Sequence, residues 1–222
     1  MKIAGLDLSI SSSGVVVEEL NDLFEVMNAE RYGFADTREN IRETIIPGND
    51  IKSFDNSYQR YKFIADNIFE WCKDCEYVAI EDIATHAKGM IIDLAEFEGY
   101  IKMSLFNMGK KVRLYSVKTN KKFFSGHGDS DKIGMYRAFL KWPHKMPSIS
   151  DLPVVVNGKK GTKPTSDIVD AASLCELLRF ELRLKNCIIK MSELPKYQQE
   201  VFNGSPDKNG IALLNKQFIT LR

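Results

Sequence analysis

The chain has 222 residues, of which 44% are hydrophobic and 27% are charged. This length suits one large domain or two small ones, and the composition excludes a disordered chain because its apolar surface can offset the ordering entropy. No apolar run approaches the ~20 residues that span a bilayer, and the first residues lack the apolar stretch of a signal peptide. We therefore expect a cytoplasmic protein. Because its formal net charge is only +1, it would have to bind any polyanion through a local patch of charge.

Apolar periodicity divides the first part of the chain into strands and helices. Continuous or alternating apolar runs predict strands, and apolar residues three and four positions apart predict helices. In chain order we expect strands at 2–8, 15–20 and 23–31, a polar excursion at 33–56, a helix at 57–75, a strand at 77–83, a helix at 88–108 and a strand at 111–117. The small-residue turn SISSSG makes the first two strands an antiparallel pair.

The rest of the chain is predominantly helical. In order we expect a helix at 130–142, a mobile loop at 143–165, a helix at 165–185 and an extension at 186–222 that opens with a strand at 186–191. Asp129 or Ser130 is the expected N-cap of the first helix, and the loop is expected to move because it holds four of the seven prolines. These elements predict one mixed α/β domain over 1–185, with a five-stranded sheet flanked by helices on both faces.

The four cysteines fit a reducing compartment. Cys72 and Cys75 form a single CxxC, while Cys175 and Cys187 stand far from it in the sequence. A zinc site usually needs two such pairs or a Cys/His quartet, and this CxxC does not open a helix after a strand as a thioredoxin-like motif does. We therefore expect buried free thiols on helices.

Four acidic residues interrupt apolar patterns. Asp7 ends the first strand, Glu81 breaks into a buried strand, and Asp167 and Asp170, three residues apart, project from one face of the last long helix. A carboxylate in a central strand is costly to desolvate unless it is paired or binds a cation. Each acid also has an ordinary structural explanation. Asp7 could accept hydrogen bonds from the turn, and Glu81 could lie at a frayed strand end. Asp167 could cap its helix, and Asp170 could interact with the helix dipole.

Taken together, the four acids favour a hard divalent cation with oxygen ligands. Mg²⁺ and Mn²⁺ are the ions that such a ligand set suits. Two of these ions ~3.5–4 Å apart can activate a water and stabilise the leaving oxygen of a phosphodiester.

The order and context of the acids resemble the RuvC family of Holliday junction resolvases, which has the ribonuclease H-like fold. GLDLSISSSG on the first strand, AIED on a later strand and DIVDAASL at the start of the last long helix match the acidic motifs of that family in order and approximate spacing. A lysine before a Gly-x-Gly turn and another after it also match, at Lys121 and Lys132, as does Gly99. The resemblance covers residues 2–185.

This resemblance implies a divalent-metal-dependent endonuclease that nicks four-way DNA junctions symmetrically. Asp7 would bridge two Mg²⁺ ions, and Lys132 would neutralise charge that develops on the scissile phosphate, with Lys121 assisting or binding a neighbouring phosphate. Glu81 and Asp170 would each hold one ion or orient the attacking water, and Asp167 would complete the catalytic and metal-binding set. The resemblance also implies a homodimer through the helix at 88–108, because two symmetric sites suit a four-way junction; the alternative for that helix is a place in the domain's own core.

The sequence departs from bacterial RuvC proteins at two positions. Asp7 is followed by Leu-Ser-Ile rather than by Pro-Gly. This serine-rich form looks more like the RuvC-like enzymes of bacteriophages, which implies a viral protein that acts in the host cytoplasm. Ala84 stands where bacterial members have an aromatic residue that stacks near the junction, so base stacking and cleavage-sequence preference do not carry over.

A basic run extends from Gly99 to Gly128. It contains seven basic residues and no acid, with Tyr115, Phe123 and Phe124 interleaved. Such a run is commonly a solvated face, but beside a four-carboxylate site it predicts a surface for phosphates. The residues expected to bind DNA are Lys118, Lys121, Lys122, Lys132 and His127.

Three other functions are compatible with parts of this pattern. A ribonuclease H-like nuclease for flaps, hybrids or RNA would keep the same acids and change only the binding surface. A sugar kinase or actin-like ATP-binding domain shares the opening strand, Asp and turn, but it needs a second phosphate loop that the sequence lacks. A structural DNA-binding module would bind without metal-dependent nicking.

Overall fold

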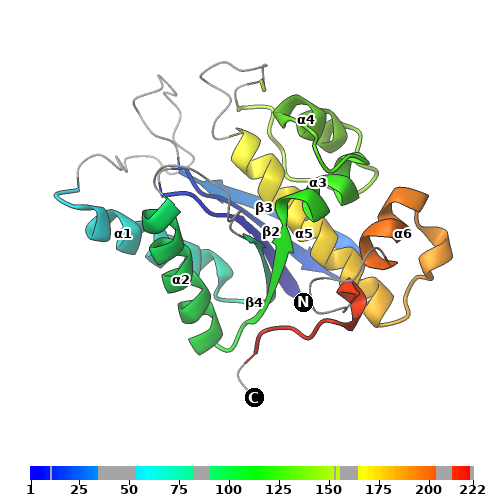
Figure 1. The fold of residues 1–222 in the computed structure, drawn as a ribbon, viewed down its shortest axis with the longest axis horizontal. Helices are drawn as coiled ribbons and strands as arrows, with labels where there is room; N and C mark the ends of the chain where they lie inside the picture. The colour runs from blue at the N-terminus through cyan, green and yellow to red at the C-terminus, as the bar shows by residue number, and fades with distance from the viewer. Residues whose placement is uncertain are drawn as a thin grey trace.

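Five strands form one mixed sheet in the order β3-β2-β1-β4-β5 (Figure 1). The sheet belongs to a computed structural model that describes residues 1–10, 12–34, 54–82, 91–152, 154–155, 165–203 and 212–220. β2 runs antiparallel to both of its neighbours, whereas β1, β4 and β5 are parallel. The strands are β1 (Lys2–Asp7), β2 (Gly14–Leu20), β3 (Val26–Gly33), β4 (Cys75–Asp82) and β5 (Lys111–Ser116).

Helices cover both faces of the sheet, which confirms the predicted mixed α/β class (Figure 1). One core cluster joins the sheet to α1 and α2, and a second joins its other face to α3, α4, α5 and α6. The helices are α1 (Ser57–Cys72), α2 (Ile91–Asn107), α3 (Val117–Ser125), α4 (Lys132–Leu140), α5 (Thr165–Lys185) and α6 (Lys196–Asn203), with short 3₁₀ turns at Met191–Glu193 and Leu213–Asn215.

α5 is the helix that lies directly on the sheet. Nearly all of its residues from Thr165 to Leu182 are buried, which explains why its sequence lacks a polar stripe. Two glycines allow this approach: a Cβ on Gly5 of β1 would lie 2.1 Å from the Ala171 carbonyl oxygen, and a Cβ on Gly14 of β2 would lie 2.4 Å from the Asp167 carbonyl oxygen. The helix backbone therefore contacts the strand backbone with no side chain between them.

Two helices were not predicted from the sequence. α3 begins directly after β5, with Ser116 as its N-cap and Gly126 (φ 88°) as its C-cap. α6 is amphipathic and is anchored by buried Phe202. The strand expected at 186–191 is wrong, because a turn with Cys187 at φ 56° follows α5 instead.

The N-cap predicted for the helix at 130–142 is also wrong by one or two residues. Asp131, rather than Asp129 or Ser130, caps α4, and its carboxylate accepts a 2.7 Å hydrogen bond from the Gly134 N–H.

Two segments outside the predicted helices pack against the sheet edges. Ile219 forms an antiparallel bridge with Val112, so the C-terminal extension covers the outer edge of β5. At the other edge, Arg31 of β3 forms an ion pair with Asp151, and Ile149 is buried in the core. The described part of the segment at 143–165 is thus packed, and its mobility and the domain limits at 185/186 stay predictions.

All four cysteines are free, as predicted. Cys72 ends α1 and Cys175 lies on α5, but Cys75 is on a strand and Cys187 is exposed, so the expectation of buried helical thiols holds for only two of them. In the described part of the chain, no helix is long and apolar enough to cross a membrane.

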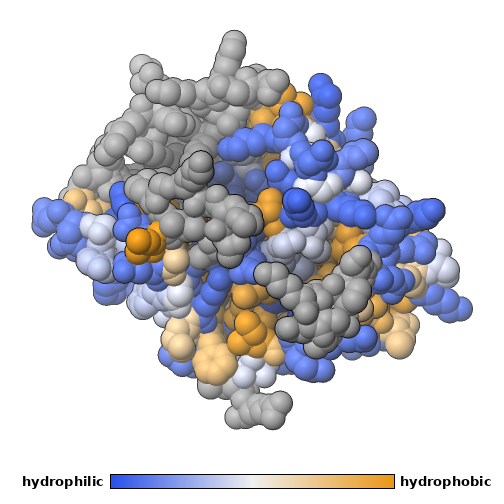
Figure 2. Space-filling view, viewed as in Figure 1, coloured by the Kyte–Doolittle hydropathy of each residue, from blue (hydrophilic) through white to orange (hydrophobic). Residues whose placement is uncertain are grey.

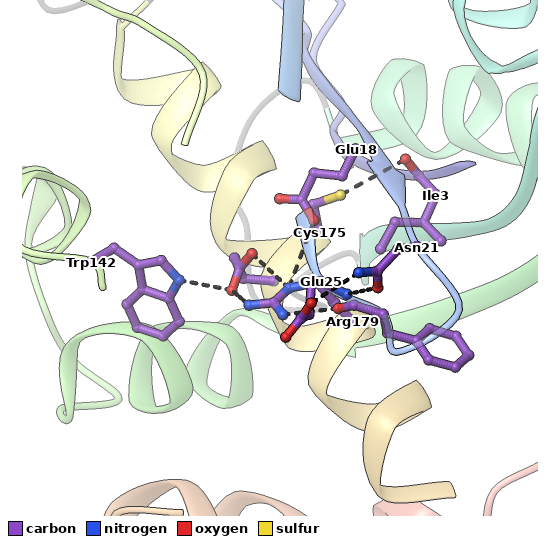
Figure 3. A network of polar contacts seen from close by, with 9 residues as sticks. Ile3, Glu18, Asn21, Glu25, Trp142, Cys175 and Arg179 are labelled. Carbon is purple, nitrogen blue, oxygen red and sulfur yellow. Dashed lines mark hydrogen bonds and ion pairs between the residues drawn. The ribbon is translucent and has the colours of Figure 1, made fainter. Parts of the chain in front are cut away.

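A buried charge network joins α5 to β2 and to the end of α4 (Figure 3). Arg179 makes two hydrogen bonds to Glu176, of 2.9 and 2.6 Å, and the indole N–H of Trp142 donates to the same carboxylate at 2.7 Å. Glu18 lies 4.0 Å from the guanidinium. Two buried carboxylates therefore share one cation, and burial, together with the charge of Glu176, raises the pKa of Glu18 well above its ordinary value, although Arg179 opposes the shift.

Replacing Glu18 with Gln should leave the protein at least as stable as the wild type at pH 7. The folded state holds the Glu18 proton more tightly than the unfolded chain, so wild-type stability falls as pH rises above the ordinary value of 4.5. Gln cannot ionise, so the variant does not lose stability in this way as pH rises. Its stability advantage over wild type should vanish near pH 4. Urea unfolding at both pH values measures it.

Glu176→Gln is the matched control for this prediction. It leaves Arg179 without its carboxylate partner, and the loss should be about 3–5 kcal/mol. A Glu18→Gln protein that is less stable than wild type at pH 7 would contradict the raised pKa of Glu18.

Candidate nuclease site

Asp7 and Glu81 lie at the ends of neighbouring parallel strands. Leu6 of β1 pairs with Ile80 of β4, so the two acids occupy adjacent positions one step further along. Side chains alternate between the faces of a strand, and Leu6 and Ile80 both belong to the core beneath α1 and α2. Asp7 and Glu81 therefore share the opposite face, which α5 covers.

The first turns of α5 bring the other two acids to the same place. Gly14, whose missing Cβ lets the Asp167 backbone approach, is also the ladder partner of Asp7. Asp167 thus sits above the end of β1, and Asp170 follows one turn later on the same face. All four predicted acids come together from β1, β4 and α5.

Electrostatic repulsion links the four acids. Burial, and then the charges of Asp170, Asp167 and Glu81, raise the pKa of Asp7 well above its ordinary value. Burial and the charges of Glu81 and Asp167 raise the pKa of Asp170 to about 7. Burial raises the pKa of Glu81 to about 6, and the charge of Glu98 on α2 adds to it. Each carboxylate makes its neighbours harder to ionise.

Two of the lysines that were predicted to bind DNA oppose this repulsion. Lys132, the first residue of α4, lowers the pKa of Asp7 and Asp170, and Lys121 of α3 lowers that of Glu81 and Asp170. Lys132 also donates a 3.2 Å hydrogen bond to the Ser166 hydroxyl. Both lysines therefore lie beside the acids, as the resemblance implies.

Two serines that the sequence analysis did not single out hold Asp167. The hydroxyl of Ser12, in the turn after β1, donates to Asp167 Oδ2, and that of Ser166 donates to Oδ1 at 3.1 Å. Both serines are buried. The serine-rich motif therefore has a definite role in fixing a carboxylate, but its composition alone indicated only a turn.

The donor set suits a hard divalent cation, since it consists of carboxylate oxygens with excess negative charge that two lysines only partly offset. The side chains as placed do not enclose an ion: among the described residues, no three His, Cys, Asp or Glu side chains form a group that could hold one. A bound cation would have to draw the carboxylates together by side-chain rotation.

The remaining predicted DNA-binding residues lie on or beside α3. Hydrophilic residues predominate over α3 and α4 (Figure 2). Lys118 is exposed at the start of α3, and His127 is exposed in the following Gly-His-Gly turn. Lys122 faces the other way and forms a 2.8 Å ion pair with Glu200 of α6. None of these three interacts with the acids in the way that Lys121 and Lys132 do.

The basic run from Gly99 to Gly128 is not one continuous face. Arg113 is buried and forms an ion pair with Glu181. The interleaved aromatic residues are core residues, so they are not available for stacking on bases; they are Tyr115, Phe123 and Phe124. Residues that are adjacent in sequence here belong to β5 and α3, which point their side chains in different directions.

α2 has two apolar faces. The predicted stripe turns inward, where Phe97, Ile101 and Leu105 are buried against α1 and the sheet. On the outer side, Ile92 and Met103 are 71% and 60% exposed. Gly99 lies on this outer side, and a Cβ there would meet nothing within 4 Å.

Comparison with solved structures shows the fold. Thermus thermophilus RuvC in complex with a Holliday junction substrate is 17% identical over 83% of this chain and 96% of that one, with a TM-score of 0.54. The fowlpox virus resolvase in complex with substrate Holliday junction DNA is 12% identical over 82% and 99%, with a TM-score of 0.50. No family model and no curated protein matches the sequence. The chain therefore has the ribonuclease H-like fold that the sequence motifs predicted.

Proposed function

We propose that the protein is a divalent-metal-dependent endonuclease that resolves four-way DNA junctions. The observation that carries the proposal is the meeting of Asp7, Glu81, Asp167 and Asp170, from three separate elements, beside Lys121 and Lys132. The similarity to two proteins solved with Holliday junction DNA supports the choice of substrate.

In this proposal the four acids hold two Mg²⁺ ions, with Mn²⁺ as a substitute. Asp7, whose pKa is raised by the charges of all three other acids, would bridge the ions, while Glu81 and Asp170 would each hold one or orient the attacking water. Bound divalent ions would activate the attacking water and stabilise the leaving oxygen. Asp167, fixed by Ser12 and Ser166, would complete the site with little freedom to move.

The lysines would act on the DNA rather than on the ions. Lys132 would neutralise charge that develops on the scissile phosphate, and Lys121 would assist or bind a neighbouring phosphate. Lys118, Lys122 and His127 would bind neighbouring phosphates along α3. Lys122 would first have to break its ion pair with Glu200, which costs little because the pair is exposed.

Cleavage of synthetic substrates tests the proposal. With Mg²⁺, the purified protein should nick an immobile four-way junction in two opposed strands, leaving 5′-phosphate and 3′-hydroxyl ends, and EDTA should stop the reaction. A fork, a flap and an RNA–DNA hybrid should be cut more slowly. Preference for the hybrid or the flap would identify a different ribonuclease H-like nuclease, and binding without nicking would identify a structural DNA-binding module.

The serine-rich first motif supports a finer proposal about origin. Ser12 holds Asp167 in this chain, and the motif that contains it resembles that of bacteriophage RuvC-like enzymes. We propose that the protein is a phage-type member that acts in the host cytoplasm.

A homodimer through the outer face of α2 completes the proposed enzyme. Symmetric nicking needs two sites related by a two-fold axis, and this face carries exposed Ile92 and Met103 around a glycine. A helical glycine costs about 1 kcal/mol relative to alanine. A Cβ at position 99 would meet nothing within the described chain, so the close approach of a second α2 would explain why a glycine stands there.

Gly99→Leu should therefore shift the protein from dimer to monomer and reduce paired nicking. The larger side chain would prevent close helix approach without disturbing the core of one protomer, so thermal stability of the monomer should not fall. Sedimentation at several concentrations measures the shift. Arg137→Leu, which places the same side chain at an exposed position of α4, is the control, and a Gly99→Leu protein with an unchanged dissociation constant would refute this interface.

A further inference from the structure

Asn120 is a polar residue in an apolar place. It lies in the middle of α3 and is 0% exposed, on the same inward side as Phe123 and Phe124. A leucine at this position would suit both the helix and the surrounding core better, because Asn has lower helix propensity and must lose its hydration.

The Asn120 amide has no hydrogen-bond partner among the described residues. Both its Nδ2 and its Oδ1 are buried, and neither makes a hydrogen bond. Leaving a buried polar group unsatisfied costs about 1–3 kcal/mol, and buried side-chain amides are normally paired. Gln198 illustrates the usual case: it is also buried, and its amide donates a 3.2 Å hydrogen bond to the Phe123 carbonyl oxygen. The unpaired Asn120 amide therefore calls for a functional explanation.

Glu81 is the charged group that this amide acts on. β4 and β5 are parallel and in register up to Asp82 and Ser116, so the start of α3 stands beside the end of β4. The Asn120 amide lowers the pKa of Glu81, which favours its charged form, although the two side chains do not form a hydrogen bond. The charge of Glu81 in turn raises the pKa of Asp7.

We propose that Asn120 is a positioning residue for Glu81. Its Nδ2 donates a hydrogen bond to one oxygen of the Glu81 carboxylate when that side chain turns to bind a cation, and the other oxygen is then directed at the ion. This inference rests on the proposed metal-dependent function. Groups that orient ligands in this way typically contribute about 10- to 100-fold to metal affinity or activity.

Asn120→Leu separates a positioning role from a structural one. It removes an unsatisfied amide and fills the same space, so the variant should be at least as stable as wild type. Mn²⁺ affinity, measured from the free-ion electron paramagnetic resonance signal without DNA, should fall about 10- to 100-fold. Junction cleavage should fall in parallel and recover partly at higher Mn²⁺, while junction binding in EDTA stays unchanged. Asn120→Ala, which is smaller, serves if leucine does not fit.

Gln198→Leu is the matched control, since it removes a paired amide of the same core and should lower stability without changing Mn²⁺ affinity. An Asn120→Leu protein with wild-type Mn²⁺ affinity and cleavage would overturn the positioning role alone. Loss of affinity only in proportion to loss of stability would also overturn it. A wild-type protein that neither binds Mn²⁺ nor cuts junctions would overturn the proposed function, and this inference with it.

Discussion

Asp7→Asn is expected to abolish junction cleavage while leaving junction binding intact. The charges of the other three acids all act on Asp7, and in the proposed site its loss removes the ligand that both ions would share. Residues that only orient ligands contribute about 10- to 100-fold, and loss of a bridging ligand should therefore exceed about 100-fold. Single-turnover cleavage in Mg²⁺ and a mobility-shift assay in Ca²⁺ or EDTA measure the two effects separately.

The same substitution should not destabilise the fold. The pKa of Asp7 is raised because burial and three neighbouring acids disfavour its charge, so a neutral isostere relieves repulsion. The melting temperature without metal should equal or exceed that of wild type, the pattern of a site that trades stability for function. Asp22→Asn, on an exposed turn, is the control. Full cleavage by the Asp7→Asn protein would refute the site.

Gly5→Ala is expected to destabilise the protein strongly. The new Cβ would lie 2.1 Å from the Ala171 carbonyl oxygen and 2.6 Å from the Cys175 nitrogen, both backbone atoms of α5. Neither can move alone, so the whole helix must shift from the sheet, at a cost of about 3 kcal/mol or more. For a chain of this size that corresponds to a fall in melting temperature of roughly 6–12 °C.

The shift should also impair the proposed site, since the same helix carries Asp167 and Asp170. Cleavage by the folded fraction at low temperature should therefore fall along with stability. Gly99→Ala provides the comparison: its Cβ meets nothing, and helix propensity should make a single protomer slightly more stable. A Gly5→Ala protein with wild-type stability would show that α5 does not rest on β1 as described.

The sheet, four of the helices and the four acids could be predicted from the sequence because their signals are local. Period-two patterns fix which face a strand residue occupies, and an acid within an apolar run is costly enough to indicate a function. Asp7 and Glu81 stand out for this reason. The resemblance then supplied what periodicity could not: that these acids meet Asp167 and Asp170 in space.

Other parts of the site depend on tertiary contacts that leave no local signal. Ser12 belongs to a run of serines that predicts only a turn, and its bond to Asp167 spans most of the chain. Asn120 looks like a polar residue in a basic surface stretch until α3 is seen to bury it. The basic run misled for the same reason, since Arg113 is used inside the fold as a partner of Glu181.

Anomalous diffraction from crystals grown with Mn²⁺ would locate the proposed ions. Two peaks are expected at the end of β1, with Asp7 contributing oxygen ligands to both and with Glu81 and Asp170 rotated toward one each. A protein saturated with Mn²⁺ that shows no peak among these acids, or shows peaks only elsewhere, would contradict the proposed site.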